Sequence, residues 1–471
     1  MKVEQLYTGC LAQGAYYIES NGEAAVIDPL REVEQYILMA KERGAKIKYI
    51  FETHFHADFV SGHIDLSKKT GAPVIYGPTT METGFDITVG EDDQEFKLGN
   101  ATIKLLHTPG HTTESSSYLL LDENGKQHSL FSGDTLFIGD VGRPDLAQKV
   151  IAELTQDKLA RMLYSSLRNK IMPLDDDVIV YPGHGAGSAC GKNMSKETTD
   201  TLGNQKKTNY ALQPMTEDEF VNQVLDGLTP PPAYFPHNVL MNIKGYESID
   251  ELIEHGTKAI SVAEFETIAE EVKATIIDTR SETEFVKGFI PNSIFIGVDG
   301  NFATWVGTIL KDVKTPVIFI ADEGRENEVA VRMARIGFDN TLGYLKDGIE
   351  AWKQAGKELE QIESVSPAAF YDLRTPDTRV LDVRKESEYN SQHILDAQNA
   401  PLDYYEDQLA QLSTESIYYV HCLGGYRSVI FISLLKQRGY NNLVNIEQGF
   451  EGLDKLNKFE TTEYVCPTTM L

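Results

Sequence analysis

Apolar runs alternate with helical stretches along the first half of the chain. The runs that read as strands are YYIES, AAVIDP, IKYIFETH, APVIYG, ATIKLLHTPG, HSLFSGD and DVIVYPGH. Each is short and ends near residues that favour turns, which is the usual pattern of strands in a buried sheet. The alternation predicts an α/β domain. Histidines and aspartates recur where the apolar runs stop, and α/β sheets usually carry their chemistry at such strand ends.

The second half of the chain contains an internal repeat. IIDTRSETEFVKGFIPNS at 276–293 matches VLDVRKESEYNSQHILDA at 380–397, and GIEAW at 348 matches GFEGL at 449. Two copies of one α/β module are therefore expected after the first domain. A proline-rich stretch, LTPPPAYFPHN at 228–238, predicts a stiff boundary before them. The predicted domains span residues 1–256, 257–360 and 361–471.

Composition narrows the class of protein. The 471 residues are 41% hydrophobic and 24% charged, without an apolar run long enough for a bilayer, so we expect a soluble protein. The N-terminus MKVEQLYTGC lacks the features of a signal peptide, and four cysteines do not make a disulfide framework, which together favour the cytoplasm. The formal net charge of −28 disfavours nucleic acids and anionic membranes as partners. An anionic substrate would need a local basic pocket.

Four short motifs in the first domain carry potential metal ligands. They are HFHAD at 54–58, PGH at 109–111, GD at 133–134 and PGH at 182–184. Imidazole and carboxylate groups that meet at strand ends are ligands for first-row transition metals. Any one of these histidines alone could be structural, but the four motifs in this order indicate a metal site. Phe59 follows Asp58 and has no lone pair to donate.

These motifs resemble those of the metallo-β-lactamase superfamily, whose fold is a βαβ sandwich. Members that hydrolyse with two metals share a fuller H-x-H-x-D-H run, so Phe59 leaves the second position short of a ligand. The remaining set resembles the persulfide dioxygenase branch, in which two histidines and one aspartate bind a single iron. This resemblance implies one Fe(II) bound by His54, His111 and Asp134, with coordination positions left open for dioxygen and substrate.

The same resemblance suggests roles for nearby residues. His56, Asp58 and His184 match positions that bind a second metal elsewhere in the superfamily, and we expect them to support the ligands or to face the substrate. Arg143 and Asp145 are expected on a loop near the metal, with an ordinary surface ion pair as the alternative.

Cys190 is a candidate sulfur relay. It follows His184 by six residues and is expected at the mouth of the metal pocket.

The last module contains a second candidate site in HCLGGYRS. Cys422 opens a Cys-x-x-Gly-x-Arg loop that leads into the apolar run VIFISLLKQ. The N–H groups of such a loop form a nest for an anion, here at Gly424, Gly425 and Ser428. Arg427 adds charge, and a thiolate is therefore favoured at Cys422 over an inert buried thiol.

This loop resembles that of the rhodanese sulfurtransferases, in which the cysteine carries sulfane sulfur as a persulfide. Asp382 and Arg384 match the D-x-R run of that family and are expected to be structural. A gapless comparison of the two repeats places Asp322 at the position of Cys422 and Asn327 at that of Arg427. The middle module contains no cysteine and is expected to be a scaffold or an interface.

The whole architecture resembles bacterial fusions of a persulfide dioxygenase with a silent and an active rhodanese module, which detoxify sulfide. The implied reaction oxidises a low-molecular-weight thiol persulfide with O2 to sulfite, and Cys422 then supplies sulfane sulfur to form thiosulfate. Coenzyme A, bacillithiol and glutathione all remain candidates for the thiol, and a homo-oligomer is expected. Two alternatives remain open, a two-metal zinc hydrolase such as a glyoxalase II-like thioesterase, and a non-catalytic persulfide carrier or sensor.

Overall fold

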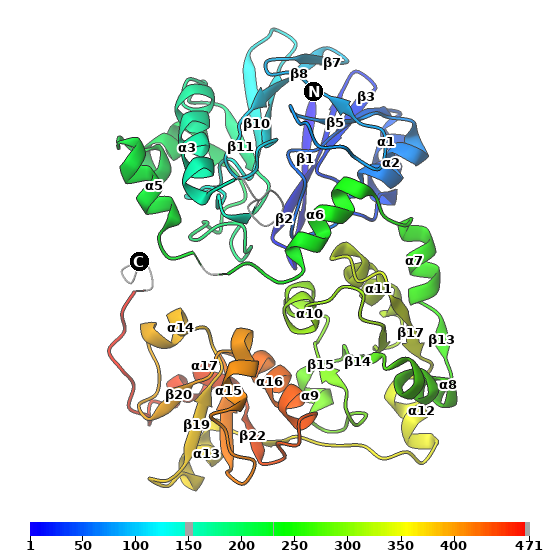
Figure 1. The fold of residues 1–471 in the computed structure, drawn as a ribbon, viewed down its shortest axis with the longest axis vertical. Helices are drawn as coiled ribbons and strands as arrows, with labels where there is room; N and C mark the ends of the chain where they lie inside the picture. Colours follow the sequence, from blue (N-terminus) through cyan, green and yellow to red (C-terminus); the bar gives the residue numbers. More distant parts are fainter. Residues whose placement is uncertain (147–153, 229, 467–471) are drawn as a thin grey trace. The chain divides into compact units, whose positions relative to one another are not determined.

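The computed structural model describes residues 1–146, 154–228 and 230–466 (Figure 1). Within these residues the chain forms two compact units. The first comprises Met1–Glu251, Lys311–Val313 and Met333–Phe338, and the second comprises Leu252–Leu310, Lys314–Arg332 and Asp339–Leu471. Each unit is described separately below.

The first unit contains two six-stranded sheets among its described residues. The first sheet runs β1 (Lys2–Thr8), β2 (Gln13–Ser20), β3 (Glu23–Ile27), β4 (Lys46–Phe51), β5 (Val74–Tyr76) and β6 (Thr88–Val89). The second runs β12 (Asp200–Thr201), β11 (Ile179–Pro182), β10 (Gln127–Gly133), β9 (Ser116–Leu121), β8 (Ala101–His107) and β7 (Glu95–Leu98). Strands lie where the apolar runs predict them, because aliphatic and aromatic residues suit a sheet that is buried on both faces.

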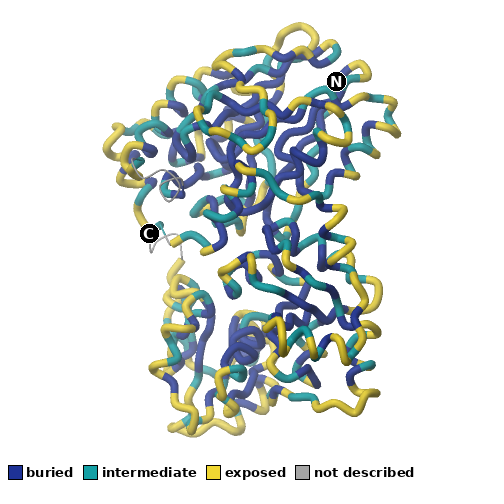
Figure 2. Tube along the Cα trace, turned by 45° about the vertical axis from the view of Figure 1, so that its right-hand side comes forward, coloured by how far each residue is buried: buried dark blue, intermediate teal, exposed yellow. Residues whose placement is uncertain are grey.

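The two sheets pack face to face, and helices cover their outer faces. Phe51 and Ile75 of the first sheet share one apolar core with Phe96, Tyr118 and Phe131 of the second. The first sheet also packs against α1 (Glu34–Arg43), α2 (His63–Thr70) and α6 (Phe235–Lys244). The second packs against α3 (Gln156–Ser166), α4 (Leu202–Thr208) and α5 (Glu217–Leu225). Buried segments, dark blue in Figure 2, run through the interior of this unit, and the predicted sandwich is confirmed.

The proline-rich stretch 228–238 lies inside the first unit and does not end it. Helix α6 begins within this stretch, and Pro236 stands in its first turn, where a missing N–H costs nothing. Ile243 of α6 then packs into the core of the first sheet. The first unit continues to Glu251.

The second unit contains two five-stranded parallel sheets among its described residues, and their strand orders correspond one to one. The first sheet runs β13 (Ala259–Ile260), β17 (Thr341–Leu345), β16 (Val317–Ile320), β14 (Thr275–Asp278) and β15 (Ile294–Phe295). The second runs β18 (Glu363–Val365), β22 (Leu443–Ile446), β21 (Tyr418–His421), β19 (Arg379–Asp382) and β20 (Ala397–Asn399). The repeat that was read from the sequence is thus one fold used twice.

The helices of the two modules also follow in the same sequence. The middle module has α8 (Val262–Thr267), α9 (Glu282–Phe285), α10 (Phe302–Leu310), α11 (Glu326–Arg335) and α12 (Gly348–Gln354), after the connecting α7 (Ile249–Gly256). The last module has α13 (Pro367–Leu373), α14 (Glu386–Ser391), α15 (Tyr405–Leu409), α16 (Tyr426–Lys436) and α17 (Gly449–Lys455). Both D-x-R runs form the same buried ion pair, with an N–O distance of 2.6 Å in Asp278–Arg280 and in Asp382–Arg384.

The strand register corrects the comparison of the two loops. Ile320 pairs with Asp278 as His421 pairs with Asp382, so Ala321 stands where Cys422 does. The middle loop then reaches α11 at Glu326 and is one residue longer, which a gapless comparison could not detect. The placement of Asp322 at this position was wrong, but the absence of a thiol there is unchanged.

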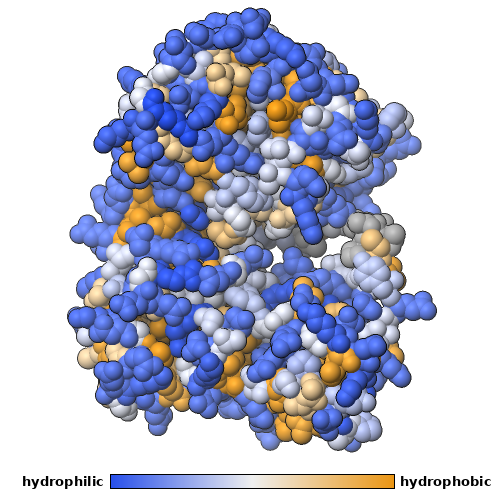
Figure 3. All heavy atoms as spheres, turned by 180° about the vertical axis from the view of Figure 1, so that it is seen from behind, coloured by the Kyte–Doolittle hydropathy of each residue, from blue (hydrophilic) through white to orange (hydrophobic). Residues whose placement is uncertain are grey.

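The surface agrees with the polar composition. On the face shown in Figure 3, hydrophilic residues cover most of the surface, and hydrophobic residues gather in patches between them. Among the described residues, no helix is both long and apolar enough to cross a membrane.

Candidate active sites

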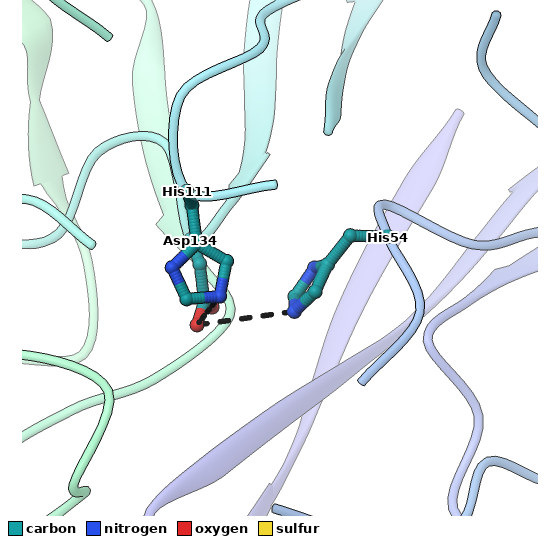
Figure 4. A group of neighbouring side chains, drawn as sticks. All are labelled: His54, His111 and Asp134. Carbon is teal, nitrogen blue, oxygen red and sulfur yellow. Dashed lines mark ion pairs between the residues drawn. The ribbon is translucent and has the colours of Figure 1, made fainter. Parts of the chain in front are cut away.

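His54, His111 and Asp134 meet in the first unit (Figure 4). His54 follows β4, His111 lies between β8 and β9, and Asp134 comes directly after β10. Their ligand atoms lie within 4.8 Å of one another, with His111 Nε2 at 3.4 Å and His54 Nε2 at 4.0 Å from Asp134 Oδ2. All three residues are buried. The structure therefore brings the three predicted ligands together.

Outer hydrogen bonds orient both histidines. His111 Nδ1 lies 2.9 Å from the carbonyl oxygen of Arg143, which can only accept, so Nδ1 carries a proton. Thr53 Oγ1 donates to Asp28 Oδ2 and therefore accepts from His54 Nδ1 at 3.0 Å. In the neutral form of each ring, the free lone pair is then on Nε2, on the side of Asp134, as metal ligation requires.

The chemistry of this group fits a cation. Neither carboxylate oxygen of Asp134 has a hydrogen-bond partner among the described residues, although both are buried. Burial, with the charges of His56, His111 and His184, lowers the pKa of His54 well below its usual value, so its ring is neutral. An unpaired buried carboxylate is costly unless a cation compensates it, and neutral imidazoles are the form that binds one.

A second group of potential ligands lies beside the first. Ligand atoms of His56, Asp58 and His184 also lie within 4.8 Å of one another, and His184 Nε2 is 3.6 Å from Asp134 Oδ1. Phe59 is fully buried, and its ring centroid lies 4.4 Å from that of His56. The second group therefore consists of three donors, and the aromatic ring of Phe59 follows Asp58 in place of a fourth.

His56 is held by two carboxylates that sequence reasoning missed. Its Nε2 lies 3.1 Å from Asp28 Oδ1 and 3.3 Å from Glu52 Oε2. Burial opposes its charged form, but the nearby carboxylates of Asp28 and Glu52 raise the pKa of His56 well above its usual value. Both carboxylates stand at the ends of apolar runs, AAVIDP and IKYIFETH, and the signal that found the ligands could have found them.

Arg143 and Asp145 form a buried pair close to the metal ligands. Arg143 Nε and Nη2 donate to the two carboxylate oxygens of Asp145 at 2.6 and 2.7 Å, and the Arg143 side chain is 5% exposed. An exposed ion pair, the alternative raised above, is thus excluded. The pair fixes the loop whose Arg143 carbonyl orients His111.

Cys190 lies within the metal site. Its sulfur is within 4.8 Å of ligand atoms of Asp134 and His184, and the residue is 1% exposed. Burial, followed by the charges of Asp58 and Asp134, raises the pKa of this thiol well above its usual value. A role for Cys190 as a sulfur relay stays a prediction.

Asn242 is a further positioning residue that the sequence did not indicate. From α6 its Nδ2 donates to the carbonyl oxygens of His56 and Phe59, at 2.8 Å each, and its Oδ1 accepts from Ser61 N–H at 2.9 Å. This one side chain satisfies three buried backbone groups between residues 56 and 61, in the HFHAD motif and the residues that follow it. Asn242 and its partners are about 180 residues apart in the chain, so no local sequence pattern predicts the contact.

Cys422 occupies the start of a tight loop in the last module. It follows β21 and is 1% exposed, and its Sγ accepts a hydrogen bond from Gly425 N–H at 3.1 Å. Ser428 Oγ lies 3.8 Å from the sulfur. Gly425 has a φ of 115°, which side chains rarely allow, so glycine is required where the N–H turns toward the thiol.

Arg427 is paired with an acid, and the anion nest at Gly424, Gly425 and Ser428 stays a prediction. Both terminal nitrogens of Arg427 donate to the carboxylate of Glu388, at 2.6 and 2.8 Å. Its charge is therefore balanced by an acid from α14 that the sequence pattern did not reveal. Gly424 is exposed and lines a cavity next to the loop.

Comparison with known proteins gives the same two classes of domain. Residues 8–184 match the metallo-beta-lactamase superfamily, and residues 261–355 and 366–455 match the rhodanese-like domain. The hydroxyacylglutathione hydrolase of Dictyostelium discoideum is 31% identical over 208 residues, which cover 43% of this chain and 72% of that protein. The cytoplasmic hydroxyacylglutathione hydrolase of Arabidopsis thaliana is 29% identical over 187 residues, covering 37% of this chain and 65% of that protein. The chain thus spans about two thirds of the length of these relatives.

A solved structure titled metallo-beta-lactamase, from Staphylococcus aureus subsp. aureus COL, is 31% identical to this chain with a TM-score of 0.64. The similarity covers 74% of this chain and 98% of that one. The fold and the buried ligand group define a metal-dependent enzyme with a sulfurtransferase-like module. The chain belongs to the metallo-β-lactamase superfamily, and it carries two rhodanese-like domains after the superfamily domain.

The role of Asn242 can be tested by hydrogen exchange. In Asn242→Ala, the three backbone groups lose their buried partner, so we expect peptides covering residues 56–61 to exchange faster and bound metal to fall. Asn222→Ala, at an exposed position of α5, is the matched control and should match the wild type. Unchanged exchange in the HFHAD loop would contradict a positioning role.

Proposed function

We propose that this protein is an iron-dependent persulfide dioxygenase coupled to a rhodanese sulfurtransferase. It would oxidise a low-molecular-weight thiol persulfide with O2 to sulfite and pass a second sulfane sulfur onto sulfite as thiosulfate. The observation that carries the proposal is the buried two-histidine, one-aspartate group, together with the buried ring of Phe59 beside the second group. Two histidines and one carboxylate are typical ligands of non-haem Fe(II) oxygenases.

The chain's own residues would position and protect this chemistry. A ferrous ion bound by His54, His111 and Asp134 would supply open coordination positions for dioxygen and for the persulfide sulfur. Arg143 and Thr53 hold the two imidazoles in the ligating tautomer, and the burial of all three ligands keeps bulk water away. The thiol carrier remains open among coenzyme A, bacillithiol and glutathione, and homo-oligomerisation also stays a prediction.

The last module would complete the reaction sequence. The sulfur of sulfite attacks the outer sulfur of a Cys422 persulfide, a new S–S bond forms, and the bond to Cys422 breaks. Thiosulfate leaves, and the sulfur that remains on Cys422 is a thiolate that the Gly425 N–H stabilises. Persulfide oxidation would thus generate the acceptor for the sulfur held on Cys422.

Loss of a metal ligand tests the dioxygenase directly. In His111→Ala we expect bound iron and oxygen uptake with glutathione persulfide to fall by roughly 100-fold or more, since losing even an outer partner can cost 10–100-fold. His107→Ala is the control, because His107 lies outside the ligand group and bonds the Thr113 carbonyl. Wild-type protein, loaded with Fe(II), that consumes no O2 with a persulfide would refute the proposal.

A two-metal zinc hydrolase is the second candidate, and two observations favour it. His56, Asp58 and His184 gather beside the first group, and the similar proteins of Dictyostelium discoideum and Arabidopsis thaliana are named hydroxyacylglutathione hydrolases. A non-catalytic persulfide carrier is a third reading, under which Cys422 alone would matter and His111→Ala would change nothing.

Restoring the missing donor distinguishes one metal from two. Phe59→His completes the H-x-H-x-D-H run, so bound metal should rise from about one ion per chain to about two. Elemental analysis of protein purified without added metal gives both values. Two zinc ions already present in the wild type, with cleavage of a glutathione thioester, would establish the hydrolase instead.

Replacement of Cys422 tests the coupling of the two domains. Cys422→Ser removes the sulfur carrier while leaving the metal ligands intact, so we expect sulfite to accumulate where the wild type forms thiosulfate, with unchanged oxygen uptake. Cys466→Ser, at an exposed cysteine, is the control. Equal thiosulfate from wild type and Cys422→Ser would show that the last module has no part in product formation.

A further inference from the structure

A cavity of about 660 Å³ lies beside the Cys422 loop, between the two modules of the second unit. Its residues from the last module and the connecting segment are Gln361, Ile362, Ser364, Gly424, Gly425, Asn445, Glu447 and Gln448. Its residues from the middle module are Glu282, Thr283, Val286 and Lys287. The volume falls within the range of small-molecule sites. The module without a cysteine therefore builds one wall of a cavity whose other wall is the cysteine loop.

The two walls are held in register by the residue that starts α16. Tyr426 Oη donates to the Gly297 carbonyl of the middle module at 2.7 Å, and its ring centroid lies 5.3 Å from that of Phe295. A Cβ at Gly300 would come within 2.4 Å of the Tyr426 ring, so the fit is close. The middle module thus contacts the loop at Tyr426, the residue after Gly425. The N–H of Gly425 donates to the sulfur of Cys422.

The cavity wall is also connected to the sulfur by side chains. Asn445 Oδ1 accepts from Ser428 Oγ at 2.8 Å, and Ser428 Oγ lies 3.8 Å from Cys422 Sγ. Asn445 itself lines the cavity, as does Gly425. A ligand in the cavity would therefore lie next to the groups that surround the reacting sulfur.

The charges of the cavity argue against a bare inorganic oxyanion as its occupant. The residue after the cysteine, Leu423, carries no charge. Both terminal nitrogens of Arg427 already donate to the carboxylate of Glu388. Lys287 pairs with Glu284 at 2.7 Å, and the carboxylates of Glu282 and Glu447 lie on the lining itself. Among the described residues that line the cavity, Lys287 is the one cation, and a small dianion there would also face the carboxylates of Glu282 and Glu447.

The neutral lining residues suit an amide-bearing chain. Gln361, Gln448, Asn445 and Ser364 carry amide and hydroxyl groups. Gln361 Nε2 donates to the Lys287 carbonyl, and Asn445 is bonded to Ser428 and Ser364, so a ligand would use chiefly Gln361 Oε1, Gln448 and the Ser364 hydroxyl. Val286 and Ile362 add apolar contact. Peptide-like groups need such a mixture, because each buried N–H and C=O must find a partner.

We propose that this cavity binds the organic, amide-bearing arm of a thiol persulfide that donates sulfur to Cys422, and that the middle module is part of this binding site. The donor class rests on the proposed function, whereas the site rests on the cavity. The Cys422 thiolate attacks the outer sulfur of R–S–SH, and a bond between the two sulfurs forms. The S–S bond of the carrier breaks, so Cys422 holds the persulfide with its proton and the carrier leaves as R–S⁻.

The proposal can be tested by a substitution in the middle module that places a large side chain in the cavity. Thr283 and Thr267 are both exposed threonines of that module, but only Thr283 lines the cavity. Full-length Thr283→Trp and Thr267→Trp are mixed without O2 with glutathione persulfide, coenzyme A persulfide or thiosulfate, and persulfide on Cys422 is followed by mass spectrometry. We expect Thr283→Trp to slow loading from an organic persulfide by about tenfold, because the tryptophan side chain would occupy the space that the organic arm needs. Loading from thiosulfate should be unchanged. Thr267→Trp should load normally from all three donors.

Any of three results would overturn the proposal. The first is normal loading of Thr283→Trp from both organic donors, and the second is no loading of the wild type from either. The third is an equal loss with all three donors, because the substitution would then disturb the Cys422 loop rather than the binding of the organic arm. Without O2 the metal site does not turn over, so a failed dioxygenase would appear only in oxygen uptake and could not be mistaken for these outcomes.

Discussion

The unpaired carboxylate of Asp134 is the constraint on which the first unit depends. It lies buried at the end of β10 without a hydrogen-bond partner among the described residues, facing two imidazoles whose protons point away from it. Such an arrangement is unfavourable in a folded protein unless a cation completes it. The Thr53 hydroxyl, the Arg143 carbonyl and the buried Arg143–Asp145 pair all help to keep lone pairs directed inward. Metal binding and local structure are therefore coupled.

The same site illustrates how one residue can alter the chemistry of a shared fold. Phe59 removes a donor from the second group but keeps its place in the packing, with its ring against His56. His56 is in turn held by Asp28 and Glu52, so the residues of a second metal position persist with one ligand fewer. The fold alone decides neither hydrolysis nor oxygenation, and the difference depends on how many ions the two groups bind.

Much of the fold and of the ligand set could be predicted because both follow from local pattern. Apolar runs end in His54, His111 and Asp134, and strand ends meet at one edge of a sheet. The repeat was visible because Asp278–Arg280 and Asp382–Arg384 form the same pair in both modules. Long-range partners were not predictable in this way. Asn242 reaches the HFHAD loop from α6, and Glu388 neutralises Arg427 from α14, and neither contact leaves a trace in sequence spacing. The loop alignment failed by one residue because register is set by strand pairing, which a gapless comparison ignores.

The middle module keeps the architecture of the last module without its cysteine. It has no thiol, yet it keeps the strand order, the buried ion pair and the short α9 of its active copy. In the active copy the corresponding α14 supplies Glu388 to Arg427, within one module. In the middle copy, α9 instead presents Glu282 and Thr283 to the cavity beside the neighbouring loop. The middle module has no cysteine to carry sulfur. Its helix α9 instead lines the cavity beside the cysteine loop of the last module. The hydrogen bond from Tyr426 to the Gly297 carbonyl adds a direct contact between the cysteine loop and the middle module, so the position of that loop depends on both modules.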